Sequence, residues 1–285
     1  MHFLLRALAG WPLPLLYGLS AVLSFVTFGI LRWRREQVDR DLALAFPERT
    51  PAERRAIRND TCRRFTDLFV EMIWGARADA AELVRRVVFE NPEVITAAAA
   101  RGQSVVLLAA HQCNWEWLLL SGGITFGFPI DAVYQPQRLA GLDRFLRETR
   151  SRFGGSPIPQ GDFVFELMNR SGELRGYALI ADQMPRPEDK KYWTRMLNRD
   201  TAFFVGAEKI AHFLESPVLY VAMRRLRRGY YTVRFVTLAA PPFDGTAGVP
   251  IMEGFARELE ASVRQAPADW LWLQKRWKYP RPADE

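Results

Sequence analysis

The longest apolar stretch of the chain lies near its start and carries no charge. Residues 7–31 are 25 positions without an acidic or basic side chain, and arginines flank them on both sides. Pro12 and Pro14 disfavour a regular helix in the first part, so we expect that helix to begin near Pro14. The 18 residues from there to Leu31 would form about 27 Å of helix, close to the thickness of the bilayer hydrocarbon. The pattern predicts a helix that spans a membrane or inserts deeply. A helix packed on the protein would usually show a polar face, and this one shows none.

The residues that follow this run indicate how the helix is oriented. Arg32 comes immediately after it and no small-residue cleavage site precedes it, so a cleaved signal peptide fits the pattern less well. Arg34 and Arg35 add to the positive charge on that side. Because basic residues accumulate on the cytoplasmic side of membrane helices, we expect the rest of the chain to stay in the cytoplasm, attached to the membrane.

Further along the chain, short apolar runs alternate with helical patterns. Such alternation predicts an α/β fold, with a central mixed sheet covered by helices and preceded by the membrane helix. The helix after position 111 is expected to end at Gly122-Gly123. The predicted strands are 104–110, 130–134, 177–181, 218–223 and 231–236, and further helices are expected at 92–102, 142–153 and 202–214.

The segment between the apolar run and the first strand reads as helical. Thr50-Pro51-Ala52-Glu53 has the form of a capping box with proline at the first helical position. Apolar residues then recur at helical spacing through positions 65–73. We therefore divide the chain into a membrane anchor helix at 1–35, a helical lead-in at 36–90 and an α/β catalytic domain at 91–285.

A histidine and a carboxylate follow the first predicted strand. His111 and Glu116 are five positions apart, which on one regular helix places them about 140° apart. If His111 lies in the turn and Glu116 in the first turns of the next helix, the two can meet beyond the carboxyl end of the strand, where α/β folds place their ligands. The imidazole would then act as a general base, with the carboxylate on its other nitrogen. The alternative is a structural histidine beside a solvated glutamate.

Further polar candidates occupy similar positions. Asp182 and Gln183 follow the strand at 177–181 as His111 follows its own, so the two strand ends would meet if these strands are neighbours. Asp182 could then orient a backbone loop or, with Gln183, bind a polar group of the substrate; alternatively, it could cap the following turn. An anionic substrate would need a cation, and Arg138 and Arg150 lie between the two motifs. Asn114, inside the histidine motif, is a further substrate-binding candidate, and residues 198–201 resemble a helix N-terminus, which could bind an anion or be simply capped.

Composition narrows the range of partners. The chain has 285 residues, 49% of them apolar, and a net charge of +7, which favours polyanionic partners. No nucleic-acid-binding motif accompanies the charge, so we expect no nucleic-acid partner. Two cysteines without framework spacing are typical of a reducing compartment, and Cys113 beside the histidine is disfavoured as a nucleophile. The three histidines show no metal-ligand spacing, so no metal is expected.

Four segments, spread over nearly the whole chain, carry motifs of one family. In this order they resemble the bacterial lipid A biosynthesis late acyltransferases, the lauroyl and myristoyl acyltransferases of the lysophospholipid acyltransferase-like superfamily. The resemblance implies a glycerolipid acyltransferase-like fold, an acyl carrier protein as donor and a lipid A precursor as acceptor. The four segments are Leu42 to Glu48, His111 to Trp117, Ala181 to Gln183 and Trp270 to Lys278.

Together with the resemblance, these features predict an O-acyltransferase bound to the inner membrane. It would move a fatty acyl chain from an acyl carrier protein or coenzyme A thioester to a hydroxyl of an anionic lipid, with His111 as base and Glu116 as its support. The thioester supplies its own leaving group, so no cofactor is expected. Two alternatives stay open: an acyltransferase for another acceptor, such as a glycolipid, aminolipid or lysophospholipid, and a non-catalytic membrane protein that binds lipid. No Gly-x-Ser-x-Gly turn points to a hydrolase.

Overall fold

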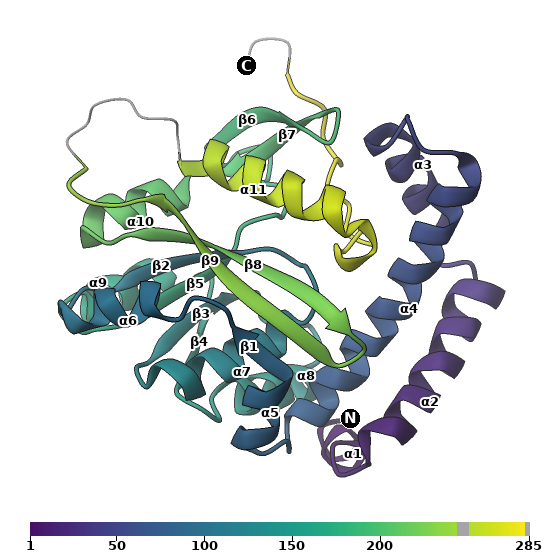
Figure 1. The fold of residues 1–285 in the computed structure, drawn as a ribbon, viewed down its shortest axis with the longest axis horizontal. Helices are drawn as coiled ribbons and strands as arrows, with labels where there is room; N and C mark the ends of the chain where they lie inside the picture. Colours follow the sequence, from purple (N-terminus) through teal and green to yellow (C-terminus); the bar gives the residue numbers. More distant parts are fainter. Residues whose placement is uncertain (244–250, 283–285) are drawn as a thin grey trace.

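Strand β2 (Val105–Ala109) lies in the middle of a seven-stranded mixed sheet, as the sequence predicts (Figure 1). The computed structural model describes residues 1–243 and 251–282. The strand order is β1-β9-β8-β2-β5-β3-β4, and β8 and β9 are the antiparallel pair. The other strands are β1 (Val87–Phe89), β3 (Ile130–Tyr134), β4 (Gly155–Pro159), β5 (Gly176–Ile180), β8 (Val218–Arg227) and β9 (Tyr230–Ala239).

Helices cover both faces of this sheet, and each face has its own apolar core. Along β2, Val106 and Leu108 pack toward one core with Phe255, whereas Val105 and Leu107 pack toward the other with Trp117. Successive side chains of a strand point to opposite faces, so a strand covered on both sides must be apolar at every position. This is why the run that precedes His111 is uniformly apolar.

The helices agree with most of the predicted pattern. The capping box at Thr50 forms as expected, with both reciprocal hydrogen bonds present at the start of α4. The helices are α1 (His2–Leu8), α2 (Leu13–Ser24), α3 (Arg35–Ala45), α4 (Pro51–Gly75), α5 (Ala80–Arg86), α6 (Glu93–Ala100), α7 (Trp115–Phe126), α8 (Ala140–Arg150), α9 (Phe163–Arg170), α10 (Gly206–Leu214) and α11 (Ile251–Gln265). A π-helix, η1 (Phe25–Ile30), extends α2, and a short 3-10 helix, η2 (Pro267–Asp269), follows α11.

The prediction that Gly122-Gly123 ends the helix after His111 is wrong. Helix α7 continues to Phe126 and stops at Gly127, whose φ of 69° is left-handed. Gly123 has a packing role instead, because a Cβ there would lie 1.8 Å from the carbonyl oxygen of Phe153. The glycine allows the chain after α8 to approach the helix backbone.

The predicted helix at 202–214 is also wrong in its first part. Residues 191–204 form a hairpin outside the main sheet, in which β6 (Lys191–Met196) pairs with β7 (Arg199–Phe204), and α10 begins only at Gly206. Asn198 lies in the hairpin turn with a φ of 62°. There is therefore no helix N-terminus at 198–201, and the anion site considered there does not exist.

The N-terminal helices lie along the lead-in helix rather than apart from the protein. In Figure 1, α2 runs beside α4. The contact includes a polar seam in which Tyr17 donates to Glu71 over 2.7 Å and Ser20 donates to Asp67 over 2.7 Å. Arg228, at the β8–β9 hairpin, pairs with the same Asp67. One side of α2 is thus fixed to the protein by hydrogen bonds.

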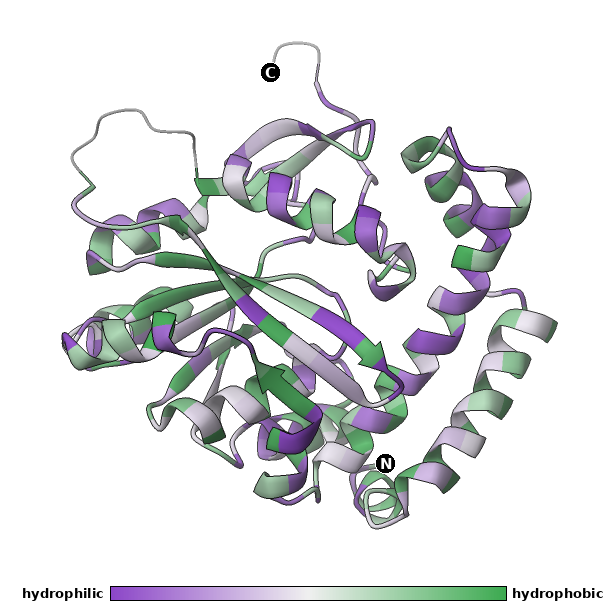
Figure 2. Ribbon diagram, viewed as in Figure 1, coloured by the Kyte–Doolittle hydropathy of each residue, from purple (hydrophilic) through white to green (hydrophobic). Residues whose placement is uncertain are grey.

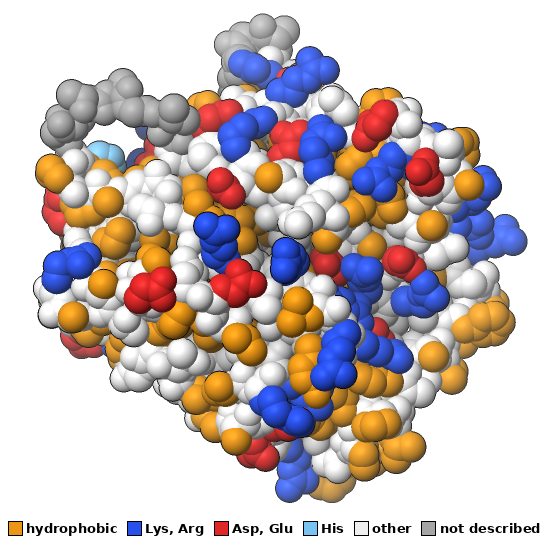
Figure 3. Space-filling view, viewed as in Figure 1, with side chains coloured by type: hydrophobic (Ala, Val, Ile, Leu, Met, Phe, Trp, Pro, Cys, Tyr) orange, Lys and Arg blue, Asp and Glu red, His pale blue; other side chains and the backbone are white. Residues whose placement is uncertain are grey.

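The opposite side of these helices is apolar and exposed. Residues 13–30 are long and apolar enough to cross a membrane, and 22% of this segment is buried within the protein. Figure 2 colours much of α1 and α2 as hydrophobic, and Figure 3 shows apolar side chains over these helices, beside a cluster of Lys and Arg near the tip of the β8–β9 hairpin. The exposed large side chains here include Phe3, Leu4, Leu15, Val22, Phe25 and Ile30.

Candidate active site

The two predicted strand-end motifs meet in the structure. Strands β2 and β5 are parallel neighbours, with Ala109 opposite Ile180. The residues that follow them, His111 and Asp182, are therefore side by side, and the Nδ1 atom of His111 lies 2.7 Å from Oδ1 of Asp182. The same oxygen accepts the backbone N–H of His111 over 3.1 Å. The carboxylate holds the histidine by both its ring and its backbone.

Asp182 is fully buried and is itself held from the other side. Its second oxygen accepts the indole N–H of Trp270 over 2.7 Å and the amide of Gln274 over 3.2 Å. Burial by itself would raise the pKa of this carboxyl, but His111 and the hydrogen bonds hold the pKa below its ordinary value. A carboxylate beside Nδ1 favours the tautomer that carries its proton there, in which Nε2 is the acceptor.

The free nitrogen of His111 faces polar and aromatic neighbours. The side-chain amide of Gln183 lies 3.4 Å from Nε2, and the ring of Trp115 packs edge-on at 4.9 Å between centroids. His111 and Gln183 both line a cavity of about 440 Å³. The nitrogen that can take a proton is thus at the edge of a space that a substrate could enter.

Glu116 does not contact His111, contrary to the expectation from their spacing. Its carboxylate forms a bidentate ion pair with Arg150 of α8, at 2.9 Å to Nε and 2.6 Å to Nη2. Helix α7 begins at Trp115, so Glu116 lies in its first turn and is directed toward α8 rather than back toward the turn. Asp182, from the neighbouring strand, occupies the place on Nδ1 that we expected Glu116 to take.

One nitrogen of the Arg150 guanidinium lacks a hydrogen-bond partner in the described part of the chain. Both Arg150 and Glu116 line the cavity that His111 lines. Within residues 1–243 and 251–282, the Nη1 atom of Arg150 is buried and has no hydrogen-bond partner. A buried guanidinium nitrogen without a partner is costly, so a bound group with an acceptor oxygen would stabilise it.

Two other predicted substrate-binding residues lie elsewhere. Asn114 is fully buried at the N-cap of α7, where its oxygen accepts from Trp117 and its amide donates to Glu71. Both ends of the amide are engaged inside the protein, so Asn114 supports the fold of the turn rather than facing the cavity. Arg138 is exposed and does not line the cavity.

Most of the remaining lining of the cavity is apolar, although Gln135, Gln137 and Gln160 also line it. The cavity extends from His111 between the sheet and the helices that cover it. A space lined mostly by apolar side chains, with a small number of polar groups, suits a hydrocarbon chain. Its apolar lining includes Leu118, Leu119, Ala132, Leu179 and Ile210.

Cys113 is not arranged as a nucleophile. Its thiol is directed at the carbonyl oxygen of Met223, 3.5 Å away. Burial and the nearby Asp269 raise the pKa of the Cys113 thiol well above its ordinary value. A group kept as a neutral thiol in this way is poorly suited to attack a thioester.

Trp270 and Gln274 are the site residues that reasoning from spacing missed. They come from the segment after η2, which also supplies the backbone N–H of Leu271 to the carbonyl of His111 over 2.9 Å. Trp270 pairs with Gln112 in an isolated β-bridge. The dense tryptophans of this segment were a visible signal, but nothing in their spacing relates them to Asp182. Across the described parts of the chain, no group of three or more potential metal ligands is found.

One family model and two known proteins each match almost the whole chain. The family model described as bacterial lipid A biosynthesis acyltransferase matches residues 1–279. The chain is similar to a "Lipid A biosynthesis acyltransferase" of Haemophilus influenzae, with 23% identity over 281 residues, covering 95% of this chain and 84% of the relative. It is also similar to the "Lipid A biosynthesis lauroyltransferase" of Escherichia coli K12, with 22% identity over 275 residues, covering 94% and 86%.

Proposed function

This chain belongs to the bacterial lipid A biosynthesis acyltransferase family, and from that membership we propose that it moves a fatty acyl chain from a thioester donor to a hydroxyl of a lipid A precursor. The observation that carries the proposal is the pairing of His111 with the buried Asp182 at the mouth of an apolar cavity. The donor is a thioester of acyl carrier protein or of coenzyme A.

His111 is the general base in this proposal. Its Nε2 removes the proton of the acceptor hydroxyl as the oxygen attacks the thioester carbonyl. Asp182 keeps the proton on Nδ1 and stabilises the imidazolium that forms. When the tetrahedral intermediate collapses, the C–S bond breaks and the thiolate takes the proton back from Nε2. The reaction is balanced without a metal or a second cofactor.

Arg150 and Glu116, which line the same cavity, support this reaction. We assign the unpartnered Nη1 of Arg150 to an oxygen of the bound substrate, such as the thioester carbonyl as it gains charge. Glu116 positions the guanidinium by its bidentate contact. Gln183, at the rim, is placed to contact the acceptor hydroxyl before it reaches His111.

The function is tested by lipid analysis. Mass spectrometry of total lipid and lipid A extracts from cells with and without this protein should show a mass gain of one acyl chain that depends on it. The mass gain identifies both the acceptor and the acyl length. A gain on a phospholipid or aminolipid alone would replace the lipid A precursor with that acceptor. Identical profiles in cells that supply the lipid A precursor would contradict the proposal.

Ala132 offers a test of the acyl cavity. The residue lines the cavity from strand β3, so replacing it with phenylalanine should fill part of the space. Each methylene of the donor that no longer fits loses about 0.8 kcal/mol of burial, so the donor preference should move to shorter chains. Competition between thioesters of different length measures the shift. The exposed Ala140→Phe variant should keep the wild-type preference, and an unchanged preference in Ala132→Phe would place the acyl chain elsewhere.

We also propose that residues 1–35 attach the protein to the membrane while α2 stays on α4. If α2 crossed the bilayer in this arrangement, Asp67, Arg225 and Arg228 would be carried to the depth of its middle, because Ser20 contacts Asp67 there. Charged groups at that depth are costly. Helix α2 would therefore lie along the membrane surface with its outer side in the lipid, an orientation known for amphipathic interfacial helices.

Charged substitutions on the outer side of these helices should release the protein from membranes. Val22 and Phe25 are 59% and 66% exposed, and the double variant Val22→Glu/Phe25→Glu should weaken vesicle binding roughly a hundredfold, since each apolar side chain contributes at least about 1.5 kcal/mol when buried. Sedimentation with vesicles measures this. The matched control is Val164→Glu/Phe213→Glu, on α9 and α10 at the far side of the sheet (Figure 1). Equal sedimentation of the two double variants would show that another surface attaches the protein.

A further inference from the structure

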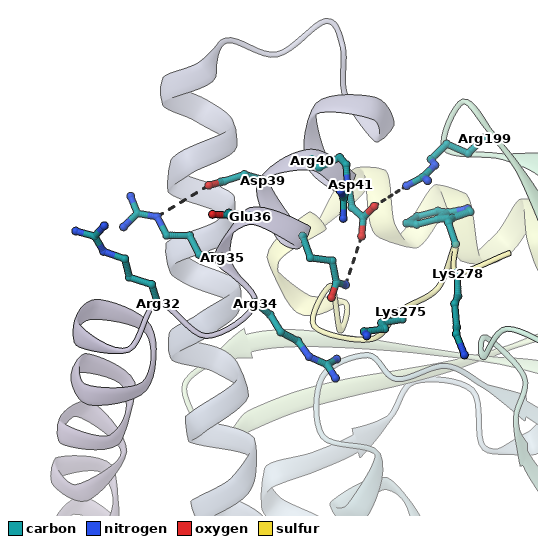
Figure 4. A pocket seen from close by; sticks show the side chains of 12 residues that line it. Arg32, Arg34, Arg35, Glu36, Asp39, Arg40, Asp41, Arg199, Lys275 and Lys278 are labelled. Carbon is teal, nitrogen blue, oxygen red and sulfur yellow. Dashed lines mark hydrogen bonds and ion pairs between the residues drawn. The ribbon is translucent and has the colours of Figure 1, made fainter. Parts of the chain in front are cut away.

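A second cavity, separate from the one beside His111, is lined mainly by cations. It has a volume of about 720 Å³ and lies between the start of α3 and the segment after η2 (Figure 4). Seven of its twelve lining residues are arginine or lysine and three are acidic. We call it the cationic pocket.

Most of the positive charge in this pocket is not neutralised by the protein. Arg199 pairs with Asp41 over 2.7 Å, and Arg35 lies 4.0 Å from Asp39. In the described part of the chain, no carboxylate lies within ion-pair distance of Arg40, Lys275 or Lys278. Several cations converging on one hollow repel one another, so an anion bound there would be stabilised.

The wall of the pocket is held in place by specific contacts. Arg32 and Arg34 both have left-handed backbones, with φ of 51° and 56°, which is unusual for residues other than glycine. Arg34 donates to the carbonyl of Leu273, and Gln37 donates to the carbonyl of Gln274 over 2.7 Å. The sharp turn between η1 and α3 is therefore tied to the segment that carries the lysines. The cations are gathered by a strained, hydrogen-bonded turn, which a merely solvated basic surface would not need.

The pocket is connected to the site of chemistry. Lys275 and Lys278 line both the cationic pocket and a shallower hollow, which Gln183 also lines. Gln183 lies at the rim of the cavity of His111, 3.4 Å from its Nε2. In addition, Gln274, next to Lys275, donates to Asp182. A continuous surface thus leads from the cations to the catalytic base.

The pocket also lies where a lipid head group would be. The apolar run ends at Leu31, so the cations follow directly on the helix proposed to lie along the membrane surface. Such a helix lies at the boundary between the head groups and the acyl chains, so the turn that follows it is at the level of the head groups. A concave pocket of this size encloses a head group, whereas a protein partner would be expected to meet a broad surface.

We propose that the cationic pocket binds the phosphate-bearing head group of the acceptor lipid and so directs its hydroxyl toward His111. This inference rests on the proposed function and names the feature of the acceptor that the enzyme recognises. Phosphate oxygens would be held by Arg40, Lys275 and Lys278, which have no other charged partner in the described structure. Specificity for a phosphorylated acceptor would follow from the pocket, and the chemistry from the His111 pair.

The test compares two triple variants with the same loss of charge. Arg40→Gln/Lys275→Gln/Lys278→Gln neutralises exposed cations of the pocket, and Arg101→Gln/Lys209→Gln/Arg234→Gln neutralises exposed cations elsewhere. The substrates are a phosphorylated lipid A precursor in detergent micelles and the same glycolipid after phosphatase treatment. The pocket variant should raise the KM for the phosphorylated acceptor by about tenfold or more, with kcat within about twofold of wild type. For the dephosphorylated acceptor, the pocket variant and the wild type should share one KM.

Four outcomes would overturn the inference while leaving the proposed function standing. An unchanged acceptor KM would show that the pocket does not hold the acceptor. A rise in the KM of an acyl carrier protein thioester instead would assign the pocket to that acidic protein. An equal rise of the acceptor KM in the control triple variant would show that the overall positive charge of the protein, and not the pocket, attracts the acceptor. Loss of binding to phosphatidylglycerol vesicles without a change in acceptor KM would assign it to bulk membrane phospholipid. If the wild type acylated neither the phosphorylated nor the dephosphorylated acceptor, the proposed function itself would be contradicted.

Discussion

The His111→Ala enzyme should lose acyl transfer by a factor of about 10² to 10⁴, the range that a positioned general base contributes. An alcohol is a poor nucleophile until its proton is being removed, and Nε2 of His111 is the acceptor at the edge of the apolar cavity. The measurement is the turnover of the purified full chain with a thioester donor, followed by release of the free thiol. The loss should fall on kcat rather than on the KM of either substrate.

His212 provides a matched control for this experiment. It is exposed on α10, and its replacement by alanine should leave turnover unchanged. Vesicle binding of the His111→Ala variant should also equal that of wild type, because the histidine lies apart from the exposed sides of α1 and α2. Turnover of His111→Ala near the wild-type rate would remove this residue from the mechanism.

Replacing Asp182 by asparagine should be nearly as damaging, by a factor of about 10² to 10⁴ in kcat, as for the aspartate of other histidine pairs. Every contact of this carboxylate is with a donor: His111 on one oxygen, Trp270 and Gln274 on the other. An amide group would place its own N–H against one of these donors. If it faces Nδ1, the imidazole carries its proton on Nε2 and can no longer accept the proton of the hydroxyl.

Asp182 acts through His111, so its test needs a readout beyond activity. The pH profile of kcat should change in Asp182→Asn, because the imidazolium loses its buried anion. The contrasting variant is Glu116→Gln. It leaves the contact between His111 and Asp182 intact and removes the negative charge beside Arg150. We expect it to keep the pH profile of the wild type. A changed profile in Glu116→Gln together with an unchanged one in Asp182→Asn would make Glu116 the orienting carboxylate after all.

The Asp182→Asn substitution should also change how the stability of the folded protein depends on pH. His111 and Trp270 hold the pKa of Asp182 below the ordinary 3.8, so the folded state favours the ionised carboxylate more than the unfolded state does. This contribution is present above pH 3.8 and is lost as the pH falls through the lowered value of the folded protein. Thermal unfolding of Asp182→Asn should therefore show a smaller loss of stability on acidification than wild type over that interval.

The fold was largely predictable because its signals are local. A strand buried on both faces must be apolar throughout, and the run before His111 shows this directly. The hairpin at 191–204 was not predictable in the same way, because it depends on the pairing of its two strands, with Tyr192 opposite Phe203 and Thr194 opposite Thr201. Gly122 and Gly123 look like the end of a helix, yet they lie within α7, where the side chain of Ile130 approaches Gly122 and the backbone of Phe153 approaches Gly123.

The candidate site was predictable in position but not in pairing. Strand ends gave His111 and Asp182 as candidates, and their meeting depended on β2 and β5 being neighbours, which no local pattern states. Glu116 was favoured as the partner because it is close in sequence, yet the direction of α7 places it against Arg150. Trp270 and Gln274 were hidden for the same reason: their relation to Asp182 exists only in three dimensions.

The lateness of Trp270 in the chain has a consequence for biosynthesis. The carboxylate of Asp182 obtains its indole donor from a residue 88 positions later, after both strands of the site have been made. During translation, a nascent chain already holding His111 and Asp182 therefore lacks the contacts that fix them. Such a chain would be a poor catalyst. All strands of the sheet precede Trp270 in the chain, so a polypeptide that ends before Trp270 would contain the sheet and lack a complete site. Acyl transfer would therefore require that translation has continued beyond Trp270.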